Sequence, residues 1–253
     1  MRFASLGSGS RGNATLVEAG ATRVLLDCGF SCAETEKRLT WLGLDAQQVD
    51  AILVTHEHSD HISGVARFSR RFGIPVWMTA GTEAVHRGGE VAAWHCFSSH
   101  EPFRIGDLAI APYPVPHDAR EPCQFVFSDG AVRLGVLTDA GSITVHMVQA
   151  LDGLDALILE CNHDPEMLAR GPYPVRLQQR VGGRYGHLSN QQAADLLRQI
   201  VTSRLQHLVA AHLSEKNNRV DLARAALAQV LHCAAADISV AEQETGIAWR
   251  DVV

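Results

Sequence analysis

The chain has 253 residues, of which 46% are hydrophobic and 20% are charged, a balance typical of a folded globular protein and not of a disordered or fibrous one. Its 22 basic and 28 acidic residues give a net charge of −6, which disfavours a protein that coats polyanions through its overall charge. At this length we expect residues 1–253 to form a single domain without a large inserted cap.

The sequence has no run of 18 apolar residues, and its first residues lack the basic and then apolar pattern of a secretion signal. We therefore expect a cytoplasmic protein with no membrane association, and no obligate protein partner is evident. The six cysteines show no CxxC spacing, which favours reduced and mostly buried thiols over disulfides or a zinc ribbon.

The first half of the chain combines strands and helices. Apolar segments separated by glycine-rich turns predict a three-stranded meander at residues 2–6, 14–18 and 22–27. A helix is expected at 33–42, and a short buried strand at 51–55 ends abruptly in a polar cluster. A helix (63–72), a strand (75–79) and a short helix (82–86) follow.

The second half repeats this mixture. Strands are expected at 108–113, 124–128, 132–137, 154–160 and 208–211, with a hairpin turn at Asp129-Gly130. Helices are expected at 143–150, 189–201 and 221–231, the second of them capped by Ser189. Two comparable halves of this kind predict two sheets packed together with helices outside them.

The central feature of the sequence is HEHSDH at residues 56–61. By strand alternation His56 and His58 point the same way, and Asp60 and His61 follow one turn farther on. Imidazole and carboxylate ligands suit zinc, our first expectation, and manganese or iron less selectively. Four ligands so close together cannot all saturate one tetrahedral ion, so we expect two divalent metal ions completed from elsewhere in the chain.

Three further side chains of ligand type follow strand-like segments: His117, Asp139 and His212. Alone, each is a weak candidate, because Asp and His at strand ends are often caps or turn residues. Beside the 56–61 cluster we expect them to complete the metal site. A carboxylate can bridge two cations through its two oxygens, so we expect Asp139 to be the shared ligand.

In its order and spacing this set of residues resembles the metallo-β-lactamase superfamily along nearly the whole chain. The resemblance implies an α/β fold of the four-layer αβ/βα sandwich type, with the site on one edge. It also implies that the seven ligands form two sets that share one carboxylate: His56, His58 and His117; Asp60, His61 and His212; and Asp139 in both.

Within the superfamily the chain is similar to the compact bacterial YycJ/WalJ-like group, whose characteristic segments correspond to SGSRGN (8–13), ECNHD (160–164), GHLSN (186–190) and HLSEKNN (212–218). This similarity implies a phosphodiesterase or nuclease, with 5′-to-3′ exonuclease activity on DNA as one form, and a nucleic acid or other phosphodiester as partner. Antibiotic hydrolysis is disfavoured, because secreted two-metal β-lactamases carry cysteine where Asp139 stands. Glyoxalase-II-like enzymes share all seven ligands, so a small-molecule thioester or lactone hydrolase is the alternative.

A local group of arginines favours a phosphate-containing substrate. Residues 165–186 hold four arginines and one acid, Glu166. Arginine pairs bidentately with phosphate oxygens, although a solvated segment with ordinary ion pairs is the alternative. Tyr173 could stack on a base or cover the core. The expected substrate-binding residues are Asn162, His163, Arg176, Arg180, Arg184, His187 and Ser189.

Two residues are expected to act in catalysis itself. A water molecule that bridges two divalent cations has its pKa lowered from ~15.7 toward ~7, which supplies hydroxide at neutral pH. We expect Asp60 to orient this water, and His187 to steady the phosphate or protonate the leaving oxygen. The sequence leaves open the identity of the metal, DNA against RNA, exo- against endonucleolytic cleavage, the oligomeric state and the pathway.

Overall fold

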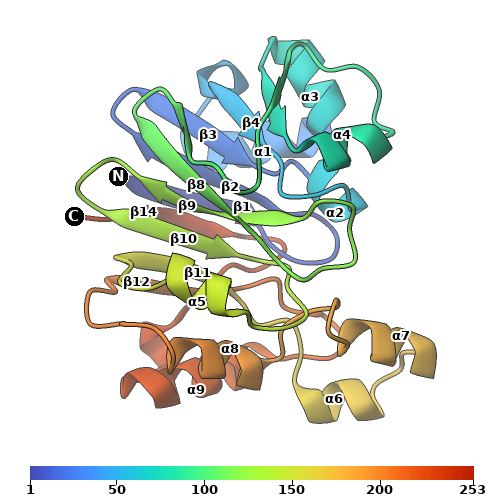
Figure 1. Cartoon of the computed structure of the whole chain (residues 1–253), viewed down its shortest axis with the longest axis vertical. Helices are drawn as coiled ribbons and strands as arrows, with labels where there is room; N and C mark the ends of the chain where they lie inside the picture. Colours follow the sequence, from blue (N-terminus) through green and yellow to red (C-terminus); the bar gives the residue numbers. More distant parts are fainter.

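The computed structural model describes all residues, 1–253, and contains two seven-stranded sheets packed against each other (Figure 1). The first sheet has the order β14-β1-β2-β3-β4-β5-β6. Its strands are β1 (Arg2–Gly7), β2 (Ala14–Ala19), β3 (Thr22–Leu26), β4 (Ala51–Leu53), β5 (Val76–Met78), β6 (Trp94–Cys96) and β14 (Ile247–Asp251). The predicted meander β1-β2-β3 is antiparallel, and β3, β4, β5 and β6 run parallel.

The second sheet has the order β13-β12-β11-β10-β9-β8-β7. Its strands are β7 (Phe103–Ile105), β8 (Leu108–Pro114), β9 (Cys123–Ser128), β10 (Arg133–Leu137), β11 (Ala156–Glu160), β12 (His207–Ala211) and β13 (Ser239–Val240). Strands β10 to β13 are parallel, while β9 is antiparallel to both β8 and β10. The C-terminal ends of β8, β10, β11 and β12 therefore lie at the same edge of this sheet.

Helices cover the outer face of each sheet, so the predicted four-layer αβ/βα sandwich is confirmed (Figure 1). The first sheet carries α1 (Cys32–Trp41), α3 (Val65–Phe72) and α4 (Ala80–Val85), and the second carries α5 (Val145–Ala150), α8 (Asn190–Leu197) and α9 (Val220–Leu231). Three short helices, α2 (Ser59–Ile62), α6 (Pro165–Arg170) and α7 (Val175–Val181), lie on the side of the molecule away from the two termini. Two 3₁₀ turns complete the elements: Ala46–Gln48 and Ala235–Asp237.

Both faces of the central strands are buried, which explains their continuous apolar sequences. In β11, Ala156 and Ile158 belong to the core between the sheets. The alternate residues Leu157 and Leu159 pack instead in the layer that includes residues of α8 and α9. Such a central strand therefore contributes to two of the three hydrophobic layers, and strand alternation decides which side chain enters which layer.

Several elements were not predicted, because their sequences carry little apolar alternation. Strand β6 has three exposed residues at an edge of the first sheet, and the chain returns at its C-terminus to pair β14 with β1. All six cysteines are free, but Cys96 and Cys233 are exposed. None of the helices combines the length and the apolar character that crossing a bilayer requires.

The core between the sheets provides a test of stability. Phe125 is fully buried there, with its ring 5.6 Å from that of Phe97 and 6.1 Å from that of Phe127, measured between centroids. We expect Phe125→Ala to lower the free energy of unfolding by about 3–5 kcal/mol, because it removes buried area and leaves a cavity. Denaturant unfolding measures this change. Val145→Ala, at a side chain that is 74% exposed, is the control and should change stability little.

Candidate metal centre

Loops that follow the C-terminal ends of strands from both sheets meet at one edge of the sandwich. They follow β1, β3 and β4 in the first sheet and β8, β10, β11 and β12 in the second. The structure brings all seven predicted ligands together there, in overlapping groups whose ligand atoms lie within 4.8 Å of one another. The seven are His56, His58, Asp60, His61, His117, Asp139 and His212.

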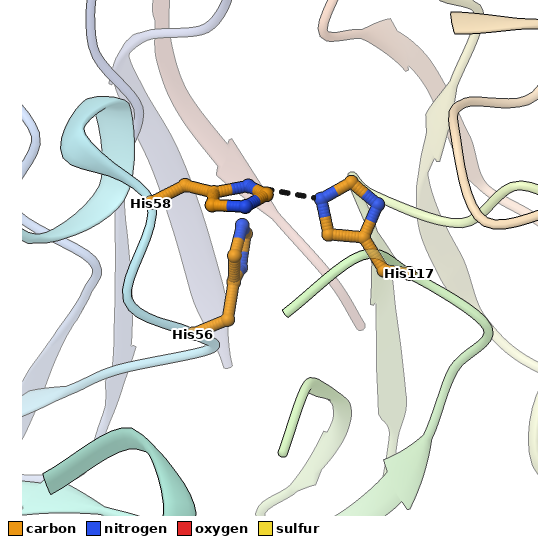
Figure 2. A group of neighbouring side chains, drawn as sticks. All are labelled: His56, His58 and His117. Carbon is orange, nitrogen blue, oxygen red and sulfur yellow. Dashed lines mark hydrogen bonds between the residues drawn. The ribbon is translucent and has the colours of Figure 1, made fainter. Parts of the chain in front are cut away.

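The first group consists of three histidines whose rings converge (Figure 2). His117 Nδ1 lies 2.9 Å from the carbonyl oxygen of Gly186, to which it donates. His58 Nε2 donates in the same way to the carbonyl oxygen of Asp118, at 3.2 Å. In neutral rings the remaining nitrogens, His117 Nε2 and His58 Nδ1, therefore carry no proton, yet they face each other at 3.1 Å (Figure 2).

In the third histidine, His56, one ring nitrogen is likewise held by a hydrogen bond and the other has no proton. The Thr55 hydroxyl donates to Asp27 Oδ2, so its oxygen accepts from His56 Nδ1, with 2.9 Å for each contact. His56 Nε2 is then left without a proton, and it is buried without a hydrogen-bond partner. Three nitrogen lone pairs thus point to one place, which is the arrangement that a metal ion needs.

The second group consists of Asp60, His61 and His212, and two buried carboxylates hold its rings. His61 Nδ1 donates to Asp27 Oδ2 at 2.7 Å, and His212 Nδ1 donates to Glu160 Oε1 at 3.1 Å. Their Nε2 atoms face Asp60 Oδ2, each at 3.4 Å. A carboxylate behind an imidazole fixes its tautomer and makes it a stronger ligand.

Asp139 lies between the two groups. Its Oδ2 is 3.1 Å from His61 Nε2, and its Oδ1 is 3.7 Å from His117 Nε2 and 3.3 Å from His212 Nδ1, so the carboxylate borders both groups. Oδ2 is buried and has no hydrogen-bond partner. This is the position that a bridging carboxylate would occupy.

The electrostatics of the cluster favour bound cations. Burial opposes the ionised form of Asp139, but His212 and His61 outweigh it and hold the pKa of Asp139 well below its usual value. Burial likewise opposes the charged form of His212, but Asp139 raises the pKa of His212 to about 10, helped by Asp60 and Glu160. Burial also lowers the pKa of His56 well below its usual value. The cluster therefore pairs ionised carboxylates with an uncharged, buried His56.

The donor set fits divalent metal ions. His56 Nε2 and Asp139 Oδ2 are buried without partners, and His117 Nε2 and His58 Nδ1 face each other without a proton between neutral rings. Leaving several buried polar atoms unpaired is costly, and one cation in each group would satisfy them at once. Imidazole nitrogens and carboxylate oxygens of this kind bind divalent ions and, by themselves, do not select one metal.

A cavity of about 310 Å³ opens onto the cluster. Three of the predicted substrate-binding residues line it: Asn162, Arg180 and His187. His187 Nδ1 donates to Glu160 Oε1 at 2.8 Å, and Arg180 Nε pairs with Asp118 Oδ2 at 2.5 Å.

The other four predicted substrate-binding residues do not line the cavity. Ser189 caps α8 by accepting from the Gln192 amide, and His163 is 3% exposed, with burial lowering its pKa to about 4. Arg176 and Arg184 are exposed and make no ion pair with an acidic side chain.

Three residues that support the site had no predicted role. Asp27 and Glu160 hold His61 and His212, and both stand at a predicted strand end, the same pattern that identified Asp139. Asn13 lies in the glycine-rich segment 8–13, with its Nδ2 atom 3.2 Å from Asp60 Oδ2. Its Oδ1 accepts from the Ser8 hydroxyl, which in turn accepts from the His212 amide.

Comparisons with known proteins agree with this geometry. The chain is 35% identical over 235 residues to the exodeoxyribonuclease YycJ of Bacillus anthracis, covering 91% of this chain and 89% of that protein. It is 33% identical over 245 residues to the exodeoxyribonuclease WalJ of Streptococcus pneumoniae, covering 94% and 90%. Among solved structures, the metallo-beta-lactamase fold protein YhfI of Bacillus subtilis superposes with a TM-score of 0.75 at 18% identity, covering 98% of both chains.

The family model described as the beta-lactamase superfamily domain matches residues 22–212. This range begins at β3 and ends at His212, so it includes all seven clustered ligands. The chain belongs to this family of beta-lactamase superfamily domains.

Proposed function

We propose that this protein is a metal-dependent phosphodiesterase that cleaves nucleic acid, acting on DNA as a 5′-to-3′ exonuclease. The convergence of five histidines, each with its outer nitrogen held by a fixed acceptor and its inner nitrogen facing the cluster, carries the proposal. The relatives that match this chain over about nine-tenths of its length are named exodeoxyribonucleases, which supports nucleic acid as the substrate.

We propose that the site holds two divalent metal ions, zinc first, with manganese or iron as alternatives. His56, His58 and His117 would hold one ion, Asp60, His61 and His212 the other, and Asp139 both. When bound, such ions supply Lewis acidity and lower the pKa of water from ~15.7 toward ~7.

The protein's own groups have separate tasks in this proposal. Asp60 lines the cavity, and its carboxylate makes hydrogen bonds to the protein only through Oδ2, so Oδ1 is available to orient the attacking water. His187 also lines the cavity. Glu160 accepts a hydrogen bond from its Nδ1, so Nε2 is the nitrogen that would deliver a proton to the leaving oxygen.

The nucleic acid backbone would be bound by arginines near the cavity. Arg176 and Arg184 make no ion pair with an acidic side chain, so phosphate need not displace an acid from them. Arg180 is already paired with Asp118, and Arg170 with Glu166. The two unpaired arginines are therefore the first candidates for contact with phosphate.

Removal of one ligand tests the metal site. We expect His61→Ala to abolish DNA cleavage and to reduce the bound metal, which elemental analysis and a cleavage assay on end-labelled DNA measure together. Because His61→Ala leaves Asp27 buried without its partner, Asp60→Asn at a partly exposed ligand is a milder second variant. Asp27→Asn keeps every ligand but weakens the support of His61, so metal affinity should fall about 10–100-fold. Cleavage by folded His61→Ala at the parental rate would refute the metal site.

If His187 transfers a proton, its replacement should change catalytic activity much more than metal content. General acid catalysis contributes about 10²–10⁴-fold, so His187→Ala should lower kcat for phosphodiester cleavage by at least about 10²-fold while metal content stays near that of the parent. The assay uses end-labelled DNA, whose alkoxide leaving group needs a proton, beside elemental analysis. If activity and metal content fall by equal factors, His187 supports the site and does not transfer a proton.

The two unpaired arginines predict a change in salt dependence. Each lost contact with phosphate lowers the slope of log affinity against log salt by about 0.7 for a single strand. The double variant Arg176→Gln/Arg184→Gln should therefore bind single-stranded DNA more weakly, with a slope smaller by up to about 1.4. The control is Arg104→Gln. Arg104 lies in β7 and pairs with Ala109 near the start of β8, whereas His117 follows the end of β8. An unchanged slope in the double variant would exclude these arginines from the interface.

A further inference from the structure

Helix α7 has no buried residue, although it carries large apolar side chains. Leu177 and Val181 are spaced by four residues and share one face of the helix, and Tyr173, just before the helix, borders the same cavity. Hydrogen bonds hold the segment in place: Gln178 Nε2 donates to the carbonyl oxygen of Tyr173 at 3.0 Å, and the His187 amide donates to that of Val181 at 2.8 Å. This apolar face is therefore held in position without being packed into a core.

The apolar face of α7 forms one wall of the cavity at the metal centre. Tyr173, Leu177 and Val181 line the cavity, and the rest of its lining is polar, charged or glycine. The polar lining includes the ligands His58, Asp60, Asp139 and His212. The cavity therefore has a charged side suited to a phosphate and an apolar wall, provided by one segment, suited to a flat uncharged group.

The size of the cavity limits what can fill it. Its volume of about 310 Å³ is at the lower end of the ~300–1,000 Å³ of small-molecule pockets. This gives room for one small ligand and not for a length of double helix. A single nucleotide combines a phosphate with a flat base, which are the two groups that the two sides of this cavity fit.

We infer that Tyr173, Leu177 and Val181 form a platform for the base of the terminal nucleotide whose phosphodiester is cleaved at the metal centre. This inference rests on the proposed function and adds the substrate's form: a single-stranded end from which one nucleotide is removed at a time. Leu177 and Val181 offer no hydrogen bond, and every base has a π-face, so the platform binds all four bases.

Substrates with and without a terminal base test the platform. Two single-stranded DNA oligomers are compared, one with a normal terminal nucleotide and one with an abasic terminal residue, with the abasic residue placed at either end in separate substrates. Stacking of a base on an aromatic side chain contributes roughly tenfold or more in affinity, so the parent should show a KM about tenfold higher for the abasic end. Tyr173→Ala should show that higher KM on the normal substrate, with kcat little changed and no further loss on the abasic one.

Two variants control for loss of the phenol group and for general surface effects. Tyr173→Phe keeps the ring and should keep the preference for a terminal base. Tyr185→Ala removes a tyrosine that is 62% exposed and does not line the cavity, so it should keep the full preference as well. If Tyr173→Ala raises KM by the same factor on both substrates, the platform inference is wrong, while cleavage by the parent would still support the proposed function.

A binding measurement separates failure of the platform from failure of the proposed function. Calorimetry with the metal-loaded protein compares thymidine monophosphate with deoxyribose 5-phosphate, which lacks the base. The parent should bind the nucleotide about tenfold more tightly, and Tyr173→Ala should bind both alike. Equal affinity of the parent for the two ligands would overturn the platform whatever ester the enzyme hydrolyses. If the parent hydrolyses a thioester but neither oligomer, the proposed function fails.

Discussion

The centre of this protein depends on hydrogen bonds behind the metal-facing side chains. Each of five histidines gives one ring proton to a fixed acceptor: the Thr55 hydroxyl, two backbone carbonyl oxygens, and the carboxylates of Asp27 and Glu160. In the neutral form of each ring the second nitrogen is then an acceptor that faces inward. Bound cations would pair with these inward-facing lone pairs, so the folded chain holds the side chains in the arrangement that the cations need.

The two sheets make this convergence possible, because the C-terminal ends of their strands share one edge. The loop after β3 also packs very closely against α2, the helix that carries Asp60 and His61. A Cβ atom placed on Gly29 would lie 1.8 Å from the carbonyl oxygen of Asp60, and one on Gly64 would lie 2.0 Å from that of Phe30. Glycine at these positions allows the approach, and the backbone thereby fixes where the two ligands stand.

The two sides of the cavity are held in place by different kinds of contact. Its charged side is built on strand ends and on buried side chains, where groups have little freedom to move. Its apolar wall belongs to the segment 165–186, which leaves the second sheet after β11 and is held largely by hydrogen bonds. The predicted ligands and the apolar wall therefore lie on separate elements, so variants of one can be tested with little change in the other.

The sequence by itself determined most of the strands and helices and the seven predicted ligands, because strand alternation and closely spaced histidines are local properties of the chain. It did not assign roles to Asp27, Glu160 and Asn13, although the first two stand at strand ends like the ligands. Two features depend on contacts between residues distant in the chain: which strand ends come together, and which nitrogen of each ring points inward. Asp60 and His212, for example, are 152 positions apart. Only the tertiary structure decides such contacts, because a short apolar strand can pair with many others until all of them are packed together.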